Sequence, residues 1–144
     1  MIGYLDTSAL LKLLLHDEEG ADVVRELIAA TDMNFTARIS HPEARAALAA
    51  ARRAGRLAAD DHARAKRDID RAIASLRIVE LGAGLARAAG DVAERFDLRA
   101  YDAVHLASAL VVDDGSTVVV TWDRALAHAA GGAGLGVAPR VEKV

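Results

Sequence analysis

The sequence has 144 residues, of which 53% are hydrophobic and 27% are charged, and its net charge is −3. This length suits one domain spanning residues 1–144, and the negative balance excludes a general basic surface for gripping nucleic acid. The absence of cysteine excludes disulfides and thiolate metal sites, and an aromatic content of only 3% argues against a base-stacking sheet.

The first residues show no targeting segment, because a basic region followed by an apolar stretch is missing. The apolar run over residues 9–15 contains Lys12 and is too short to cross a bilayer. We therefore expect a cytoplasmic protein with no membrane contact.

Short apolar runs alternate along the chain with longer segments of helical periodicity. In chain order the predicted elements are a strand Ile2–Leu5, helices Thr7–Leu15 and Ala21–Ala30, a strand Asn34–Arg38, helices Pro42–Ala54 and Asp60–Ser75, a strand Leu76–Glu80, helices Ala83–Phe96 and Ala100–Val112, a strand Thr117–Thr121, a helix Arg124–Ala130 and an edge strand near Val137. Gly55 is expected to end one helix, and Asp60 or Asp61 to cap the next. The alternation predicts an α/β fold: a parallel sheet with helices on both faces.

Four acidic residues stand at or near the positions where such a sheet binds ligands, which are the carboxyl ends of its strands. Asp6 and Asp123 directly follow strands, and either can simply cap the next helix. Glu43 comes shortly after the second predicted strand and also fits a capping box with Ser40. Asp102 lies in the first turn of a helix, where the macrodipole favours a negative charge. Each acid therefore has a structural explanation of its own.

The joint placement of these acids suggests a metal site. Carboxylates brought to one edge raise one another's pKa values, and a divalent cation relieves that repulsion. Oxygen ligands without cysteine favour Mg²⁺, with Mn²⁺ as its substitute. The chemistry that such a site supports is in-line attack of water on a phosphodiester.

Three segments are similar to the signatures of a known family: Tyr4-Leu5-Asp6-Thr7-Ser8-Ala9-Leu10, Leu98-Arg99-Ala100-Tyr101-Asp102-Ala103-Val104-His105-Leu106-Ala107 and Val120-Thr121-Trp122-Asp123-Arg124-Ala125-Leu126. Together with Glu43, and in this order over nearly the whole chain, they resemble a PIN domain. More narrowly, they resemble the toxin nuclease of a VapBC-type toxin–antitoxin pair.

The resemblance implies a sheet order of 3-2-1-4-5, Mg²⁺- or Mn²⁺-dependent endoribonuclease activity, a homodimer and a cognate small antitoxin protein. It assigns catalysis to Asp6, Glu43, Asp102 and Asp123, and metal binding to the three aspartates. Thr7, Ser8 and Thr121 carry over as supporting hydroxyl groups. The two helices around Gly55 would form an arm for antitoxin and dimer contacts.

Several nearby side chains have a functional and a structural interpretation. His105 lies one helical turn after Asp102, and a packed histidine is favoured over a metal ligand. Arg124 and Arg38 lie near the proposed edge and are predicted to contact RNA. Arg45 belongs to a basic helix surface that a solvated face explains equally well.

Two other functions stay open. The domain could bind RNA or a partner without cutting, with its acids serving only as helix caps. A phosphoryl-transfer domain also places an aspartate after a strand, but Ser8 stands where the phosphatase pattern needs a second acid.

Overall fold

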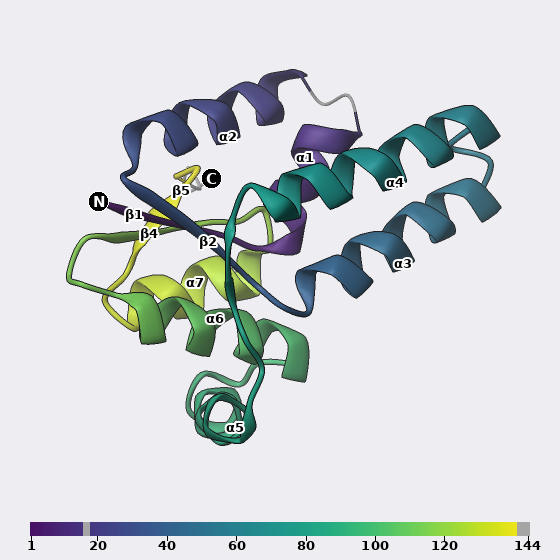
Figure 1. Ribbon diagram of the computed structural model, residues 1–144. Helices are drawn as coiled ribbons and strands as arrows, with labels where there is room; N and C mark the ends of the chain where they lie inside the picture. Colours follow the sequence, from purple (N-terminus) through teal and green to yellow (C-terminus); the bar gives the residue numbers. More distant parts are fainter. Residues whose placement is uncertain (16–17, 141–144) are drawn as a thin grey trace.

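The computed structural model describes residues 1–15 and 18–140, and its strands and helices alternate (Figure 1). In chain order the elements are β1 (Ile2–Leu5), α1 (Thr7–Leu14), α2 (Glu18–Ala30), β2 (Met33–Ala37), α3 (Ser40–Arg53), α4 (Ala59–Ala74), β3 (Arg77–Val79), α5 (Ala83–Phe96), α6 (Ala100–Val112), β4 (Thr117–Val120), α7 (Arg124–Gly132) and β5 (Gly136–Ala138). The strands form one sheet in the order β3-β2-β1-β4-β5, and every neighbouring pair is parallel. The predicted α/β fold and strand order are confirmed.

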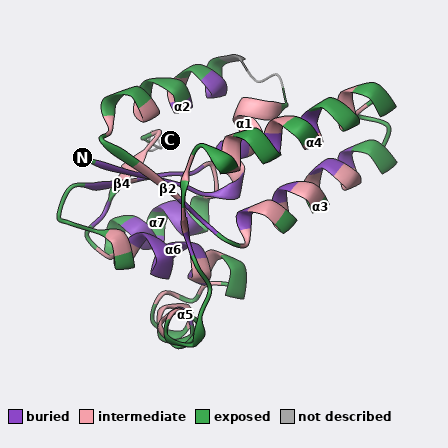
Figure 2. Cartoon of the chain, in the orientation of Figure 1, coloured by how far each residue is buried: buried purple, intermediate pink, exposed green. Residues whose placement is uncertain are grey.

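The sheet separates two hydrophobic clusters because successive side chains of a strand point to opposite faces. Tyr4 and Val119 pack with Leu106 and Leu126, which come from α6 and α7. The next residues along β1 and β4 pack on the other face against α1–α4; this second cluster includes Leu5, Val120, Leu10, Val24, Leu48 and Ile69. Buried residues accordingly run through the centre of the molecule in Figure 2.

Helix boundaries differ from the predicted ones at a few places. Helix α2 begins at Glu18, three residues earlier than predicted. Helix α4 is preceded by Ala58 and has no side-chain cap, so the predicted capping by Asp60 or Asp61 is wrong. Both acids lie in the first turn instead, where the helix dipole favours them. Gly55, with φ at +73°, follows the end of α3 as predicted.

Helices α3 and α4 lie side by side as an arm that extends beyond the sheet (Figure 1). In the described residues, no helix is both long and apolar enough to cross a membrane. The carboxyl ends of β1, β2 and β4 lead toward the starts of α1, α3 and α7, and this end of the sheet carries the site.

Candidate active site

Asp6 is held at the end of β1 by hydroxyl and amide donors and is only 4% exposed. Its Oδ1 accepts hydrogen bonds from the Ala9 amide at 2.9 Å and the Ser8 hydroxyl at 2.7 Å. Its Oδ2 accepts one from Thr121 Oγ1, at the end of β4, at 2.6 Å. Burial raises the pKa of Asp6, and the bonds from Thr121 and Ser8 offset part of that rise. Asp6 therefore caps α1, and it is also bonded across the sheet.

Glu43 does not form the capping box that its spacing from Ser40 suggests. Ile39 occupies the cap position of α3 and offers no side-chain bond. The Ser40 hydroxyl is buried and bonds to Thr36 Oγ1 at 2.7 Å. The structural explanation for Glu43 is thus wrong, because its carboxylate bonds to residues outside its own helix.

The partners of Glu43 come from α1 and α6. Its Oε1 accepts a hydrogen bond from Thr7 Oγ1 at 2.8 Å and lies 2.7 Å from His105 Nε2. Burial acts to raise the pKa of Glu43, but the hydrogen bond and charge of His105, together with the Thr7 bond, outweigh it and lower that pKa. Glu43 is therefore ionised at neutral pH.

His105 is 2% exposed and connects Glu43 to the core. Its Nδ1 lies 2.8 Å from the hydroxyl of Tyr4, whose ring is fully buried. Burial raises the pKa of Tyr4 well above its ordinary value, so the phenol keeps its proton. If the Tyr4 hydroxyl donates to Nδ1, a proton on Nε2 points to Glu43 and donates to its carboxylate. The prediction that His105 is a packed histidine is confirmed.

Asp102 and Asp123 face one another from the starts of α6 and α7. Asp123 caps α7 by accepting a bond from the Leu126 amide at 2.9 Å. Burial and the negative charge of Asp123 raise the pKa of Asp102, and Arg99 acts in the opposite direction. Arg99 Nε lies 3.5 Å from Asp102 Oδ2, and Arg99 Nη2 lies 4.0 Å from Asp123 Oδ2. The negative charges of Asp102 and Asp123 therefore lie near each other in a partly buried position, beside the exposed guanidinium of Arg99.

Thr121 links Asp6, at the end of β1, to the backbone of Asp123, at the start of α7. Its hydroxyl donates to Asp6 and accepts a bond from the Asp123 amide at 3.0 Å. His105 influences the pKa values of Asp6 and Asp102 as well as that of Glu43. The four predicted acids therefore gather at one end of the sheet. Each of the predicted hydroxyl groups, on Thr7, Ser8 and Thr121, bonds to one of them.

Among residues 1–15 and 18–140, no group of three or more acidic or histidine side chains lies close enough together to hold a metal ion. The donor chemistry nevertheless fits a hard cation, because Asp102 and Asp123 are oxygen donors that repel each other. Mg²⁺ often takes only one or two carboxylates and keeps several waters.

The arginines that are predicted to contact RNA lie in different elements around this end of the sheet. Arg38 follows β2 and forms an ion pair with Glu80, at 2.9 Å between Nε and Oε2. Arg45 is partly buried on α3, and Arg124 is exposed at the start of α7. Their role stays a prediction.

Two residues of the site, Arg99 and Tyr4, are not among those predicted from the sequence. The three-residue spacing of Arg99 from Asp102 is a signal that they share a helix face. Nothing in the sequence alone indicates that Tyr4 bonds to His105, because 101 residues separate them.

The chain is similar to a named protein in sequence and to solved structures in fold. A relative named Ribonuclease VapC45, from Mycobacterium tuberculosis (strain CDC 1551 / Oshkosh), is 45% identical over 136 residues, which are 94% of each chain. The solved structure of PAE2754 from Pyrobaculum aerophilum has a TM-score of 0.70 at 26% identity and covers 95% of this chain and 83% of its own.

A second solved structure is VapBC2 from Rickettsia felis bound to a DNA fragment from its promoter. It has a TM-score of 0.67 at 14% identity, covers 95% of this chain and 97% of its own, and supports the fold alone. The model of the family described as PIN domain matches residues 3–132. The family match and the 45% identity to a relative over 94% of the chain show that this chain belongs to the PIN domain family.

Proposed function

We propose that this protein is a magnesium-dependent endoribonuclease and the toxin of a VapBC-type pair. The observation that carries the proposal is the meeting of Asp6, Glu43, Asp102 and Asp123 at one sheet end, where hydroxyl groups bond to Asp6 and Glu43 and where Asp102 lies near the charge of Asp123. The identity of 45% to Ribonuclease VapC45 supports RNA as the substrate.

The aspartates are proposed as the metal ligands and Glu43 as the proton acceptor. A bound Mg²⁺ or Mn²⁺ ion would supply Lewis-acid activation of water and neutralise charge on the phosphate. Asp102 and Asp123 are the more accessible ligands, whereas Asp6 is oriented by Ser8 and Thr121. The bonds that orient Asp6 would spare the reorganisation that a free carboxylate needs.

Glu43 is ionised and oriented by Thr7 and His105, which suits it to take a proton from the attacking water. The water oxygen forms the new bond to phosphorus while the bond to one ester oxygen breaks. Tyr4 bonds to Nδ1 on the other side of the His105 imidazole and keeps that ring from rotating.

We also propose that the protein binds a cognate small antitoxin, forms a homodimer and is located in the cytoplasm. A cluster of carboxylates attracts arginine, which pairs with them bidentately, so a basic segment of an antitoxin would suit this end of the sheet. Co-purification with the product of an adjoining reading frame, followed by sizing of the complex, tests both partners.

The direct test of activity is incubation of the purified protein with total RNA. Defined fragments are expected in Mg²⁺ and in Mn²⁺, none in EDTA, and fewer when the antitoxin is added. Fragmentation that persists undiminished in EDTA would contradict the metal requirement.

A non-catalytic module is the second candidate, because Asp6 and Asp123 do cap helices and the described side chains form no preformed metal cluster. Calorimetric titration with Mn²⁺ separates the two functions. A nuclease site is expected to bind the ion and to lose affinity in Asp102→Asn. If the acids serve only as helix caps, titration with Mn²⁺ should give only background heat.

A further inference from the structure

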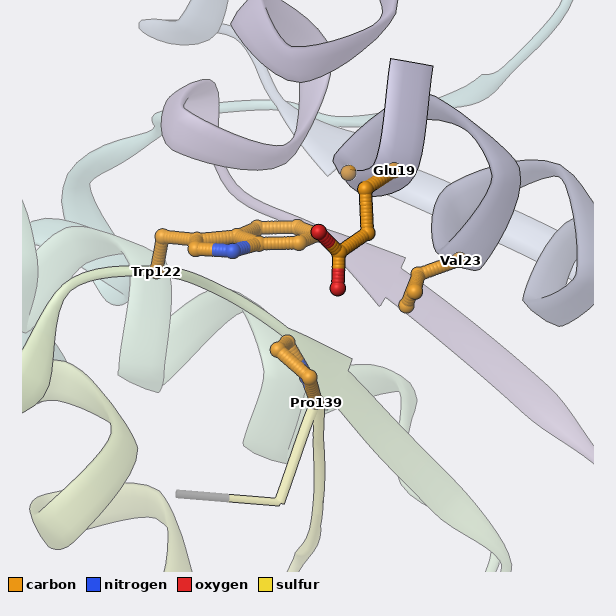
Figure 3. A pocket seen from close by; sticks show the side chains of 5 residues that line it. Glu19, Val23, Trp122 and Pro139 are labelled. Atoms are coloured by element: carbon orange, nitrogen blue, oxygen red, sulfur yellow. The ribbon is translucent and has the colours of Figure 1, made fainter. Parts of the chain in front are cut away.

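A small cavity opens at the carboxyl end of the sheet and takes no part in the proposed chemistry. It has a volume of about 270 Å³ and is lined by Glu19, Gly20, Val23, Trp122 and Pro139 (Figure 3). Trp122 directly precedes Asp123, and Pro139 directly follows β5, so the cavity lies at the carboxyl end of the sheet. Ligands of parallel sheets collect at this end.

Trp122 is tied to the acidic cluster through its backbone. Its amide donates to the Ser8 hydroxyl at 2.9 Å, and that same hydroxyl donates to Asp6 at 2.7 Å. The indole ring also has Lys12 Nζ 5.4 Å from its centroid. The backbone at Trp122 is therefore linked to Asp6 through one hydroxyl group.

The lining combines a flat apolar surface with one hydrogen-bond acceptor. The rings of Trp122 and Pro139 provide the flat surface, while Glu19 and Val23 come from α2 on the other side (Figure 3). Figure 3 shows the Glu19 carboxylate directed into the space beside the indole ring. A carboxylate repels phosphate and accepts hydrogen bonds, so the favoured occupant is a planar group with N–H donors.

The size of the cavity limits that occupant. Sites for drug-sized ligands measure roughly 300–1,000 Å³, so a cavity of about 270 Å³ suits one ring system rather than a whole nucleotide. Single-stranded RNA is commonly recognised by stacking one base on an aromatic ring and bonding its Watson–Crick edge. Guanine presents two parallel donors on that edge, at N1 and N2, which match the two oxygens of a carboxylate.

We propose that this cavity is a subsite for a guanine base of the RNA, stacked on Trp122 and bonded to Glu19. The inference rests on the proposed ribonuclease function for the source of the base. Because Trp122 and Asp123 are consecutive, the bound guanosine would lie close in sequence to the phosphodiester that is cut.

Trp122 is the only tryptophan of the chain, so intrinsic fluorescence reports directly on this cavity. The experiment titrates the metal-free protein in EDTA with GMP, IMP, AMP and UMP. GMP is expected to quench the emission and to bind at least about fivefold more tightly than IMP, which stacks similarly but lacks the N2 donors. UMP is expected to bind most weakly.

Variants separate the two contacts. Glu19→Gln should remove most of the preference for GMP over IMP, whereas Glu26→Gln, an exposed glutamate on the same helix, should retain it. Trp122→Leu, followed by equilibrium dialysis because its fluorescence is lost, should weaken GMP and IMP alike. A melting temperature near that of the wild type shows that each variant is folded.

Equal binding of GMP and UMP would overturn the subsite, and so would an unchanged preference for GMP over IMP in Glu19→Gln. Quenching by arginine amide but not by GMP would also overturn it and would indicate that the cavity binds a basic protein segment instead. Binding in EDTA does not depend on cleavage, so a failure of the proposed nuclease activity would leave this result intact. Conversely, RNA cleavage without GMP binding would refute the subsite alone.

Discussion

Thr117 and Thr121 show how single hydroxyl groups differ in their contribution at this sheet. Both are buried, one at the start of β4 and one just after its end. Thr121 Oγ1 bonds to Asp6 and to the Asp123 amide, whereas Thr117 Oγ1 has no hydrogen-bond partner within the described part of the chain. The same substitution should therefore have opposite consequences at the two positions.

Thr121→Val is expected to lower the free energy of unfolding by about 1–3 kcal/mol, because it leaves the buried Asp6 carboxylate with one donor fewer. Thr117→Val removes an unsatisfied hydroxyl and should change stability by less than about 0.5 kcal/mol or increase it. Urea denaturation of both variants measures the difference. Equal losses would show that the Thr121–Asp6 bond contributes nothing specific.

Glu43→Gln separates catalysis from structure at a residue for which the sequence also suggests a capping role. The amide oxygen can still accept from Thr7 and His105, so stability should change by no more than about 1 kcal/mol. Cleavage should fall by at least about 100-fold, because glutamine cannot take a proton from water. Paired measurements of RNA cleavage and thermal unfolding test this. Wild-type cleavage by a folded Glu43→Gln protein would remove Glu43 from the mechanism.

At the scale of elements, local patterns predict the strands, the helices and their order well. The β-branched run 117–121 and the capping positions of Asp6 and Asp123 are short-range features, and the structure confirms them within a residue or two. The error at Asp60 and Asp61 is also local, because α4 begins one residue before them and leaves them in its first turn.

The bonds within the site were harder to predict, because they join residues that are distant in sequence. Glu43 has a complete local explanation in Ser40, and only packing of α3 against α1 and α6 shows that both residues bond elsewhere. Arg99 lies within one helical turn of Asp102, so their contact could have been predicted from the sequence. The Tyr4–His105 bond and the cavity between Glu19 and Trp122 depend on tertiary structure alone.

Two glycines in different elements give a matched test of packing. At Gly3 in β1, an added Cβ would lie 2.3 Å from Asn34 Oδ1, and that oxygen is held by a 2.7 Å bond from Thr31. Gly3→Ala should therefore destabilise the protein by about 1–3 kcal/mol. At the exposed Gly90 inside α5 a Cβ meets nothing within 4 Å, so Gly90→Ala should stabilise by about 0.5–1 kcal/mol.

Thermal unfolding of these two alanine variants provides the measurement. An unchanged melting temperature for Gly3→Ala would mean that the β1–β2 contact adjusts without cost. Such a result would contradict the tight strand packing that positions Asp6.

At the scale of the whole molecule, a net charge of −3 must be reconciled with an RNA substrate. Phosphate contacts release counterions, and each contributes about −0.7 to the slope of log affinity against log salt for single strands. With two or three contacts from residues such as Arg124, we expect a slope of about −1.4 to −2.1. Filter binding of RNA to Glu43→Gln in Mg²⁺ over a range of KCl concentrations measures it. A slope steeper than about −5 would instead require an extended basic groove.

The central claim is that the acids at this sheet end form a metal-dependent site for RNA cleavage. Single-turnover cleavage of one synthetic RNA by wild type, Asp102→Asn and Asp97→Asn tests it most directly. Asp102 pairs with the exposed Arg99, and Asp97 is an exposed residue with φ at +53°, a conformation that asparagine tolerates. Both variants should therefore remain folded.

In Mg²⁺, Asp102→Asn should cleave at least about 100-fold more slowly than the wild type, while Asp97→Asn should match the wild type. EDTA should abolish cleavage by all three proteins. Wild-type rates in a folded Asp102→Asn protein, or undiminished cleavage in EDTA, would contradict the claim.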